Sequence, residues 1–140
     1  MAVFFSVIAA LILFFIIVMI LDCNRFVVRK YRCREEKLKK DVKFILLSDL
    51  HNKSFGKKNA RLLKAIDKIG ADMILIAGDM YTSATGGDIE TAAELVCTLA
   101  EKYPVYYGNG NHEHKTRLFP KDFLDMYRKF SEKIASAGVN

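Results

Sequence analysis

Three short polar clusters hold the residue types that could carry out chemistry in this chain. They are Asp49-Leu50-His51, Gly78-Asp79 and Gly110-Asn111-His112-Glu113, and each follows an apolar run. Asp49 and His51 are two residues apart, so in extended backbone their side chains leave on the same side and can meet at one ion. A carboxylate with an imidazole suits a borderline divalent metal such as Mn, Fe or Zn. An Asp-x-His pair is also common by chance, so its weight depends on the other two clusters.

The second and third clusters offer complementary chemistry. The carboxylate of Asp79 has two oxygens and can bridge two ions about 3.5 to 4 Å apart. Asn111 offers a neutral carbonyl oxygen to a metal, and His112 can donate a proton or a hydrogen bond to a leaving oxygen or a phosphoryl oxygen. The alternative is that Gly-Asp and Gly-Asn form ordinary turns, for which both pairs are well suited.

The elements that must position these clusters follow a strand-loop-helix rhythm repeated three times. Apolar runs predict strands over 42–47, 73–77 and 105–107, and apolar residues at 3.6-residue spacing predict helices over 57–69, 88–102 and about 120–138. Connections of this length make neighbouring strands parallel, and the carboxyl ends of parallel strands share one edge of the sheet. The predicted fold class is therefore α/β, with all three clusters gathered at that edge.

The strands lack polar alternation, which is typical of sheets covered on both faces. About 98 residues, 43–140, nevertheless supply only a three-stranded half of a layered domain, whose core would be open on one side. We therefore expect a β-α-β-α-β-α half of such a domain over 42–140, and a truncated sequence.

The first 21 residues have a different character. From Ala2 to Leu21 every residue is apolar except Ser6, and twenty helical residues span roughly 30 Å, the thickness of a bilayer core. No basic residue precedes this run, and it ends without a small-residue cleavage site, so residues 1–21 favour a transmembrane signal anchor over a cleaved signal peptide. The basic residues that follow predict a single-pass membrane protein whose main domain lies in the cytoplasm.

The net charge of +6 is concentrated beside this anchor. Nine basic and four acidic residues lie between 22 and 43, so five of the six net positive charges belong to that stretch. A basic juxtamembrane linker over 22–41 can attract anionic lipid headgroups, although a solvated linker helix fits the charge pattern equally well. The rest of the chain is nearly neutral and lacks interleaved aromatic and basic positions, which argues against a nucleic-acid-binding protein.

Taken together and in order at strand ends, the three clusters resemble the calcineurin-like metallophosphoesterase family, in particular its membrane-anchored bacterial members. The match covers about residues 43–115. The resemblance implies that Asp49 and His51 bind a first divalent metal, Asp79 bridges two metals, Asn111 binds the second, and His112 assists at the phosphoryl or leaving oxygen. It also implies hydrolysis of a phosphoester, of unknown identity, by a hydroxide bound to the two ions.

The chain departs from the family pattern in its later histidines. The family continues with a lone His and a Gly-His-x-His cluster, whereas the histidines here are His51, His112 and His114. The second metal would keep only Asp79 and Asn111, so we expect this chain by itself to bind metal weakly and to have little or no activity. The alternative function is a non-catalytic, membrane-anchored interaction module completed by another chain.

Overall fold

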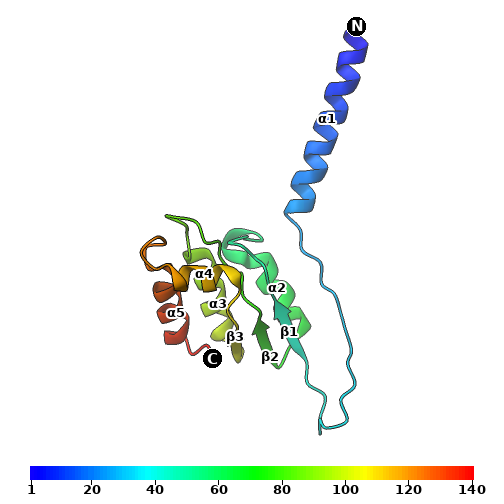
Figure 1. The fold of residues 1–140 in the computed structure, drawn as a ribbon. Coiled ribbons are helices and arrows are strands. Elements are labelled where there is room, and N and C mark those ends of the chain that lie inside the picture. The colour runs from blue at the N-terminus through cyan, green and yellow to red at the C-terminus, as the bar shows by residue number, and fades with distance from the viewer. The chain divides into compact units, whose positions relative to one another are not determined.

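A computed structural model describes residues 1–140 and contains five α-helices, one short 3₁₀ helix and three strands (Figure 1). By contacts between Cα atoms the chain divides into two compact units, Met1–Cys33 and Arg34–Asn140. The first unit contains the apolar helix, and the second contains the sheet and the remaining helices.

Helix α1 (Ala2–Cys23) is 22 residues long and has no buried residue. At about 1.5 Å per residue it reaches roughly 33 Å, which exceeds the thickness of a bilayer core. Its length and composition therefore allow it to cross a membrane. A signal sequence near an N-terminus can have the same length and composition. Between Cys23 and Phe44 the chain forms no helix or strand.

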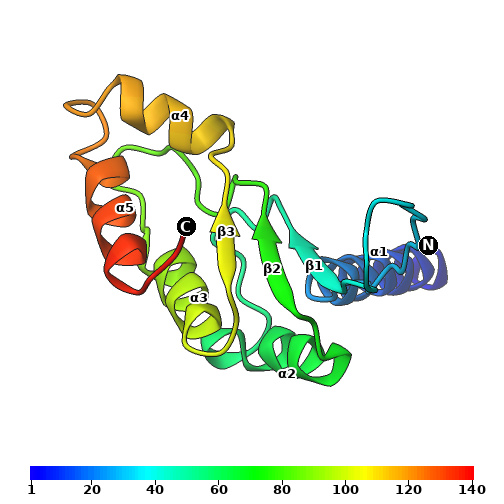
Figure 2. The same cartoon turned by 90° about the horizontal axis from the view of Figure 1, so that it is seen from below.

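The sheet of the second unit is parallel, with the strand order β1-β2-β3. The strands are β1 (Phe44–Leu47), β2 (Met73–Ile76) and β3 (Val105–Tyr107). Figure 2 shows the three arrows pointing the same way. The register places Leu46 opposite Leu75 and Leu75 opposite Tyr106. Asn140 extends the sheet beyond β3, because its N–H donates to the Val105 carbonyl oxygen at 3.0 Å and its own carbonyl accepts from Tyr107 N–H at 2.8 Å.

One face of the sheet is buried. Helices α2 (Ala60–Ile69), preceded by the 3₁₀ turn η1 (Lys57–Asn59), α3 (Glu90–Ala100) and α5 (Met126–Ser136) supply most of the apolar cover. The buried core includes Ile74, Ile76 and Val105 from the strands and Leu62, Ile66, Ala92, Ala93, Val96, Leu99, Phe130 and Ile134 from the helices. The expected apolar faces of these helices are confirmed at these positions.

The opposite face of the sheet is open. Phe44, Leu46 and Tyr106 are large apolar side chains that remain about half exposed there. The one-sided core expected for a half domain is thus observed, whereas the cover on both faces that the apolar strands suggested is not found. The α/β class, the parallel strands and the apolar N-terminal helix confirm the predicted fold. The architecture is consistent with part of a layered metallophosphoesterase fold.

The last predicted helix was wrong in its start, and one helix was missed. Pro120 lies in a turn instead of at the first helical position, and α5 begins at Met126 because Leu124 and Asp125 take left-handed backbone angles, with φ of 51° and 59°. The missed helix, α4 (Asn111–Leu118), starts inside the third polar cluster. Figure 2 shows it starting beyond the carboxyl end of β3 and running away from β2 and β1.

Candidate functional site

The three clusters meet where the strands end. Beyond β1 and β2 the backbone continues to pair: Asp49 N–H donates to the Gly78 carbonyl at 3.1 Å, and His51 N–H donates to the Asp79 carbonyl at 3.0 Å. The first two clusters are therefore held side by side by main-chain hydrogen bonds. This placement follows from parallel strands of matched length, as the sequence predicted.

Asp49 and His51 face each other across a short gap. Asp49 Oδ1 lies 3.8 Å from His51 Nε2, and both side chains are substantially exposed. Both residues have left-handed backbone angles, with φ of 58° and 48°, so the segment is a tight turn instead of the extended backbone assumed from the sequence. Their side chains nevertheless converge. The His51 ring also meets the His112 ring edge to face, with 4.9 Å between the ring centroids.

Asp79 links the second cluster to the third. Its Oδ1 accepts a hydrogen bond from the main-chain N–H of His112 at 2.8 Å. This fixes one carboxylate oxygen at the first turn of α4, where the partial positive charge of the helix N-terminus stabilises an anion. Asp79 is half-buried and also has a left-handed φ, 53°.

Two glycines allow this close approach. A Cβ atom on Gly78, whose φ is +82°, would lie 2.0 Å from the Gly110 main-chain nitrogen. A Cβ on Gly110 would lie 2.4 Å from the Asp79 main-chain nitrogen and 2.5 Å from its Oδ1. No other amino acid fits at either position without moving the backbone. The glycines of the second and third clusters thus bring their metal-ligand candidates together.

The carboxylate of Glu113 connects the second and third clusters through hydrogen bonds. Glu113 is fully buried and accepts four hydrogen bonds, which come from Asp79 N–H (2.9 Å), Met80 N–H (3.0 Å), Gly110 N–H (3.0 Å) and Tyr107 Oη–H (2.7 Å). Each of its two oxygens already accepts two hydrogen bonds, so neither is available to a metal ion. Glu113 therefore completes the motif as a structural clasp between β2, β3 and α4.

Two tyrosines, the half-buried Tyr107 and the buried Tyr81, lie close to this carboxylate. Burial, followed by the negative charge of Glu113, raises the pKa of Tyr107, so its hydroxyl remains the donor. Burial raises the pKa of Tyr81 to about 12, and its hydroxyl hydrogen-bonds to Thr116 Oγ1 at 2.8 Å. The interior beneath the site therefore keeps neutral phenols around a single buried carboxylate.

The ring of His112 is oriented by Ser83. Ser83 N–H donates to His112 Nδ1 at 2.9 Å, and the Ser83 hydroxyl lies 2.8 Å from the same nitrogen. A main-chain N–H can only donate, so Nδ1 is the unprotonated nitrogen and the ring proton resides on Nε2. The ring can therefore offer an Nε2–H donor. Sequence reasoning missed Ser83, because nothing in a serine four residues after Asp79 signals this contact.

Asn111 and His114 are placed differently from the other candidates. Asn111 is the first residue of α4 and is exposed, and its side chain makes no hydrogen bond with the other candidates. His114, which the sequence left outside the pattern, is also exposed. The structure thus brings Asp49, His51, Asp79 and His112 into one network, with Asn111 adjacent along the chain.

The donor chemistry fits divalent cations, although the side chains do not form a finished site. No group of three or more His, Cys, Asp or Glu side chains stands ready to hold a metal ion. One imidazole and one carboxylate 3.8 Å apart nevertheless suit a borderline cation, and small side-chain rotations would bring both to one ion. The residues present are therefore compatible with metal, mainly on the Asp49 and His51 side.

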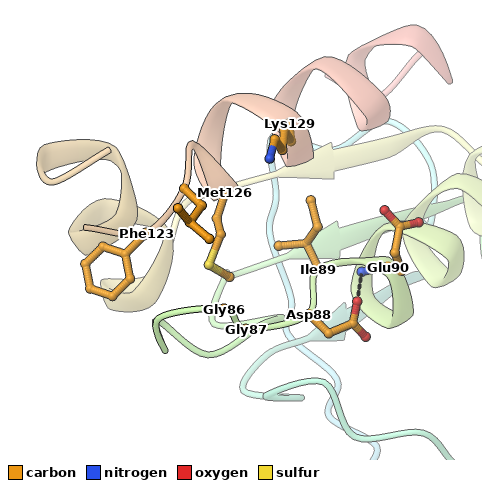
Figure 3. A pocket seen from close by; sticks show the side chains of 9 residues that line it. Gly86, Gly87, Asp88, Ile89, Glu90, Phe123, Met126 and Lys129 are labelled. Carbon is orange, nitrogen blue, oxygen red and sulfur yellow. Dashed lines mark hydrogen bonds between the residues drawn. The ribbon is translucent and has the colours of Figure 1, made fainter. Parts of the chain in front are cut away.

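A separate cavity of about 430 Å³ lies between the loop before α3 and the start of α5 (Figure 3). Its lining includes Ile89, Phe123, Leu124, Met126 and Lys129. No candidate residue of the three clusters lines it, so this cavity is distinct from the site.

Comparison with known proteins finds matches over the sheet unit of this chain. The family model described as calcineurin-like phosphoesterase matches residues 42–138. An uncharacterized metallophosphoesterase from Campylobacter jejuni is 28% identical over 94 residues, which cover 66% of this chain and 24% of that protein. One from Helicobacter pylori is 28% identical over 114 residues, which cover 75% of this chain and 30% of that protein. No solved structure matches the chain.

The chain therefore belongs to the calcineurin-like phosphoesterase family. The region it shares with these two relatives spans less than a third of their length. Members of this family are hydrolases that generally use divalent metal ions. The assignment supports a phosphoesterase type of function.

Proposed function

We propose that this chain forms the first-metal side of a metal-dependent phosphoesterase that is held at a membrane by α1. The observation that carries the proposal is the convergence of Asp49, His51, Asp79 and His112 at one edge of the sheet, within a network of hydrogen bonds and ring contacts. Two divalent cations would neutralise the charge that develops on the phosphoryl group and acidify the attacking water.

Each candidate then has a defined task in the proposal. Asp49 and His51 would hold the first ion, Asp79 would contribute to both ions, and Asn111 would contribute a neutral oxygen to the second. His112 donates a hydrogen bond from Nε2–H to a phosphoryl or leaving oxygen, since Ser83 occupies Nδ1. The substrate is a phosphoester whose identity is open.

The second ion has few ligands within this chain. Besides His51 and His112, the sequence contains only His114, which is exposed. Asp79 and Asn111 alone make a weak two-ligand site, because structural and catalytic sites for such cations use at least three protein ligands. We therefore propose that the chain by itself binds one ion better than the other and hydrolyses phosphoesters slowly.

The proposal is tested by metal uptake, because uptake does not depend on a complete active site. The detergent-solubilised chain is equilibrated with Mn²⁺ or Zn²⁺, and bound metal per chain is measured by mass spectrometry, alongside hydrolysis of p-nitrophenyl phosphate. Asp79→Ala should lose bound metal, whereas Asp122→Ala, which removes an exposed carboxylate from the turn after α4, should not. Equal metal uptake by the two variants would refute the bridging role of Asp79.

The proposed topology places α1 across the membrane and the sheet unit in the cytoplasm. The basic residues after α1 support it, through their usual retention on the cytoplasmic side. Cys33 is exposed and free in that basic stretch. A membrane-impermeant maleimide should label Cys33 in permeabilised cells and not in intact cells; labelling in intact cells would reverse the orientation.

A second candidate is favoured by the open face of the sheet. Phe44, Leu46 and Tyr106 leave apolar surface exposed, which suits a non-catalytic interaction module completed by another chain. The two candidates differ in metal binding. Under the second, the chain alone takes up no metal, and co-expression with a chain that supplies further histidines restores uptake.

A further inference from the structure

The end of α4 and the turn that leads to α5, together residues 118–125, expose apolar side chains. Leu118, Phe119 and Leu124 are 58%, 51% and 59% exposed. Helix α4 begins with Asn111 and runs for eight residues, so the turn lies only about 12 Å along the helix axis from that candidate ligand. Figure 2 shows this turn at the end of α4 that lies away from the sheet.

The segment that carries the exposed apolar residues is basic, and within it Arg128 pairs with Asp125 and Glu132. Between residues 115 and 129 there are five basic and two acidic side chains, which gives a local charge of +3. The basic residues are Lys115, Arg117, Lys121, Arg128 and Lys129. The cations of Lys115 and Arg117 lie over the rings of Phe123 and Tyr127, at 5.4 Å and 5.7 Å from the ring centroids. An exposed apolar tip within a basic segment matches the interface of a bilayer that contains anionic lipid.

The apolar surface also continues inward from the turn. Leu124 lines the cavity of about 430 Å³ together with the buried Phe123 and Met126, and the Lys129 side chain lies at the same cavity (Figure 3). Of the three exposed side chains, Leu124 thus adjoins this cavity, which Asp88 and Glu90 also line. Contiguous apolar surface marks an interaction site more often than scattered exposure does.

The segment between α1 and β1 is long enough for the turn to reach a membrane that α1 would span. No helix or strand forms between Cys23 and Phe44, and these twenty intervening residues can extend to about 70 Å. If α1 spans a bilayer, this linker allows the turn to reach the lipid surface. A tethered partner of this kind is present at high effective concentration, so modest contacts suffice for docking.

From these observations we propose that residues 118–125 dock onto an anionic bilayer surface, so that the candidate site operates next to the membrane. The inference rests on the anchoring role proposed for α1 and not on hydrolysis. It assigns the turn a lipid partner, which favours phosphoesters presented at the membrane surface as substrates.

The absence of tryptophan from the sequence makes a direct test possible. Phe119→Trp introduces a single fluorophore into the turn, and Phe44→Trp serves as the matched control, because Phe44 is 53% exposed at the amino end of β1. The full chain is reconstituted into nanodiscs of phosphatidylcholine and phosphatidylglycerol, with or without brominated acyl chains. Circular dichroism checks that each variant folds, and Leu124→Trp repeats the measurement if Phe119→Trp does not.

In brominated anionic nanodiscs the tryptophan introduced at position 119 should emit at shorter wavelength and be quenched several-fold more strongly than the one at position 44. Adding Lys121→Gln should lower the docking equilibrium about fivefold, since each basic residue contributes roughly that factor near an anionic surface. Absence of quenching in the turn, equal quenching of both reporters, or undiminished docking on pure phosphatidylcholine would each overturn the inference.

The outcome separates this inference from the proposed function. A chain that does not enter nanodiscs removes the tether and overturns both the anchoring role of α1 and the docking that rests on it. A chain that docks through the turn but takes up no metal leaves the inference intact and refutes the phosphoesterase proposal.

Discussion

The clasp made by Glu113 is open to a quantitative test. Glu113→Gln keeps the size of the side chain but replaces one carboxylate oxygen with an NH₂ group, which cannot accept a hydrogen bond. Oε1 accepts from Met80 N–H and Tyr107 Oη–H, and Oε2 accepts from Asp79 N–H and Gly110 N–H. Whichever oxygen is replaced, two of the four hydrogen bonds that Glu113 accepts are lost.

The size of the effect follows from these contacts. Hydrogen bonds to a charged group contribute about 1.5 to 3 kcal/mol each, and removing a buried charge returns part of its desolvation cost. We expect Glu113→Gln to lower the free energy of unfolding by about 2 to 4 kcal/mol, a large part of the 5 to 15 kcal/mol typical of a domain. Urea denaturation of the detergent-solubilised chain, followed by circular dichroism, measures this change.

The matched control is Glu101→Gln, which makes the same substitution at an exposed position. It should change the free energy of unfolding by no more than about 0.5 kcal/mol, as surface substitutions usually do. Metal affinity should also fall in Glu113→Gln, because the clasp holds Asp79 against the N-terminus of α4. If the two variants unfold at the same urea concentration, the reasoning about the clasp is wrong.

Three further predictions concern the residues around the site. Gly78→Ala should lower the free energy of unfolding by more than about 2 kcal/mol, because the new Cβ would lie 2.0 Å from a main-chain nitrogen. Gly70 also has a positive φ but has open space around it. Gly70→Ala should therefore cost only the backbone strain of about 1 kcal/mol. The free energy of unfolding should fall as the pH rises above 10 towards 12, because burial raises the pKa of Tyr81 from 10.0 to about 12 and the folded state therefore holds the proton more tightly. Urea titrations at several pH values should show a smaller fall for Tyr81→Phe. Nitrogen-15 NMR of His112 should show protonated Nε2 and bare Nδ1, in Ser83→Ala as well, because the main-chain N–H remains; a protonated Nδ1 would contradict the geometry.

Sequence periodicity was sufficient for the strands and for the buried faces of α2 and α3. Apolar residues at fixed spacing report burial directly, and a parallel topology follows from the length of each connection. The helix α4 was not predictable in this way, because only two of its eight residues, Glu113 and Thr116, are buried. At its start, Glu113 accepts the Gly110 N–H and also the main-chain N–H groups of Asp79 and Met80, which follow β2.

The roles assigned to Asp49, His51, Asp79, Asn111 and His112 came from a motif, and they stay predictions. What the structure adds is a physical reason why the motif is spaced as it is. The glycines are required by main-chain atoms that approach within van der Waals distance, which no periodicity or composition can reveal.

The contact between Ser83 and His112 bears on the chemistry proposed for this histidine, and the sequence pattern did not reveal it. An acidic partner at His112 Nδ1 would accept a proton from the ring and stabilise the imidazolium form. The Ser83 main chain instead donates to that nitrogen, so in this conformation the ring is neutral and its proton lies on Nε2. A neutral donor favours hydrogen bonding to a phosphoryl oxygen over full proton transfer, and the catalytic help expected of His112 is therefore electrostatic in origin.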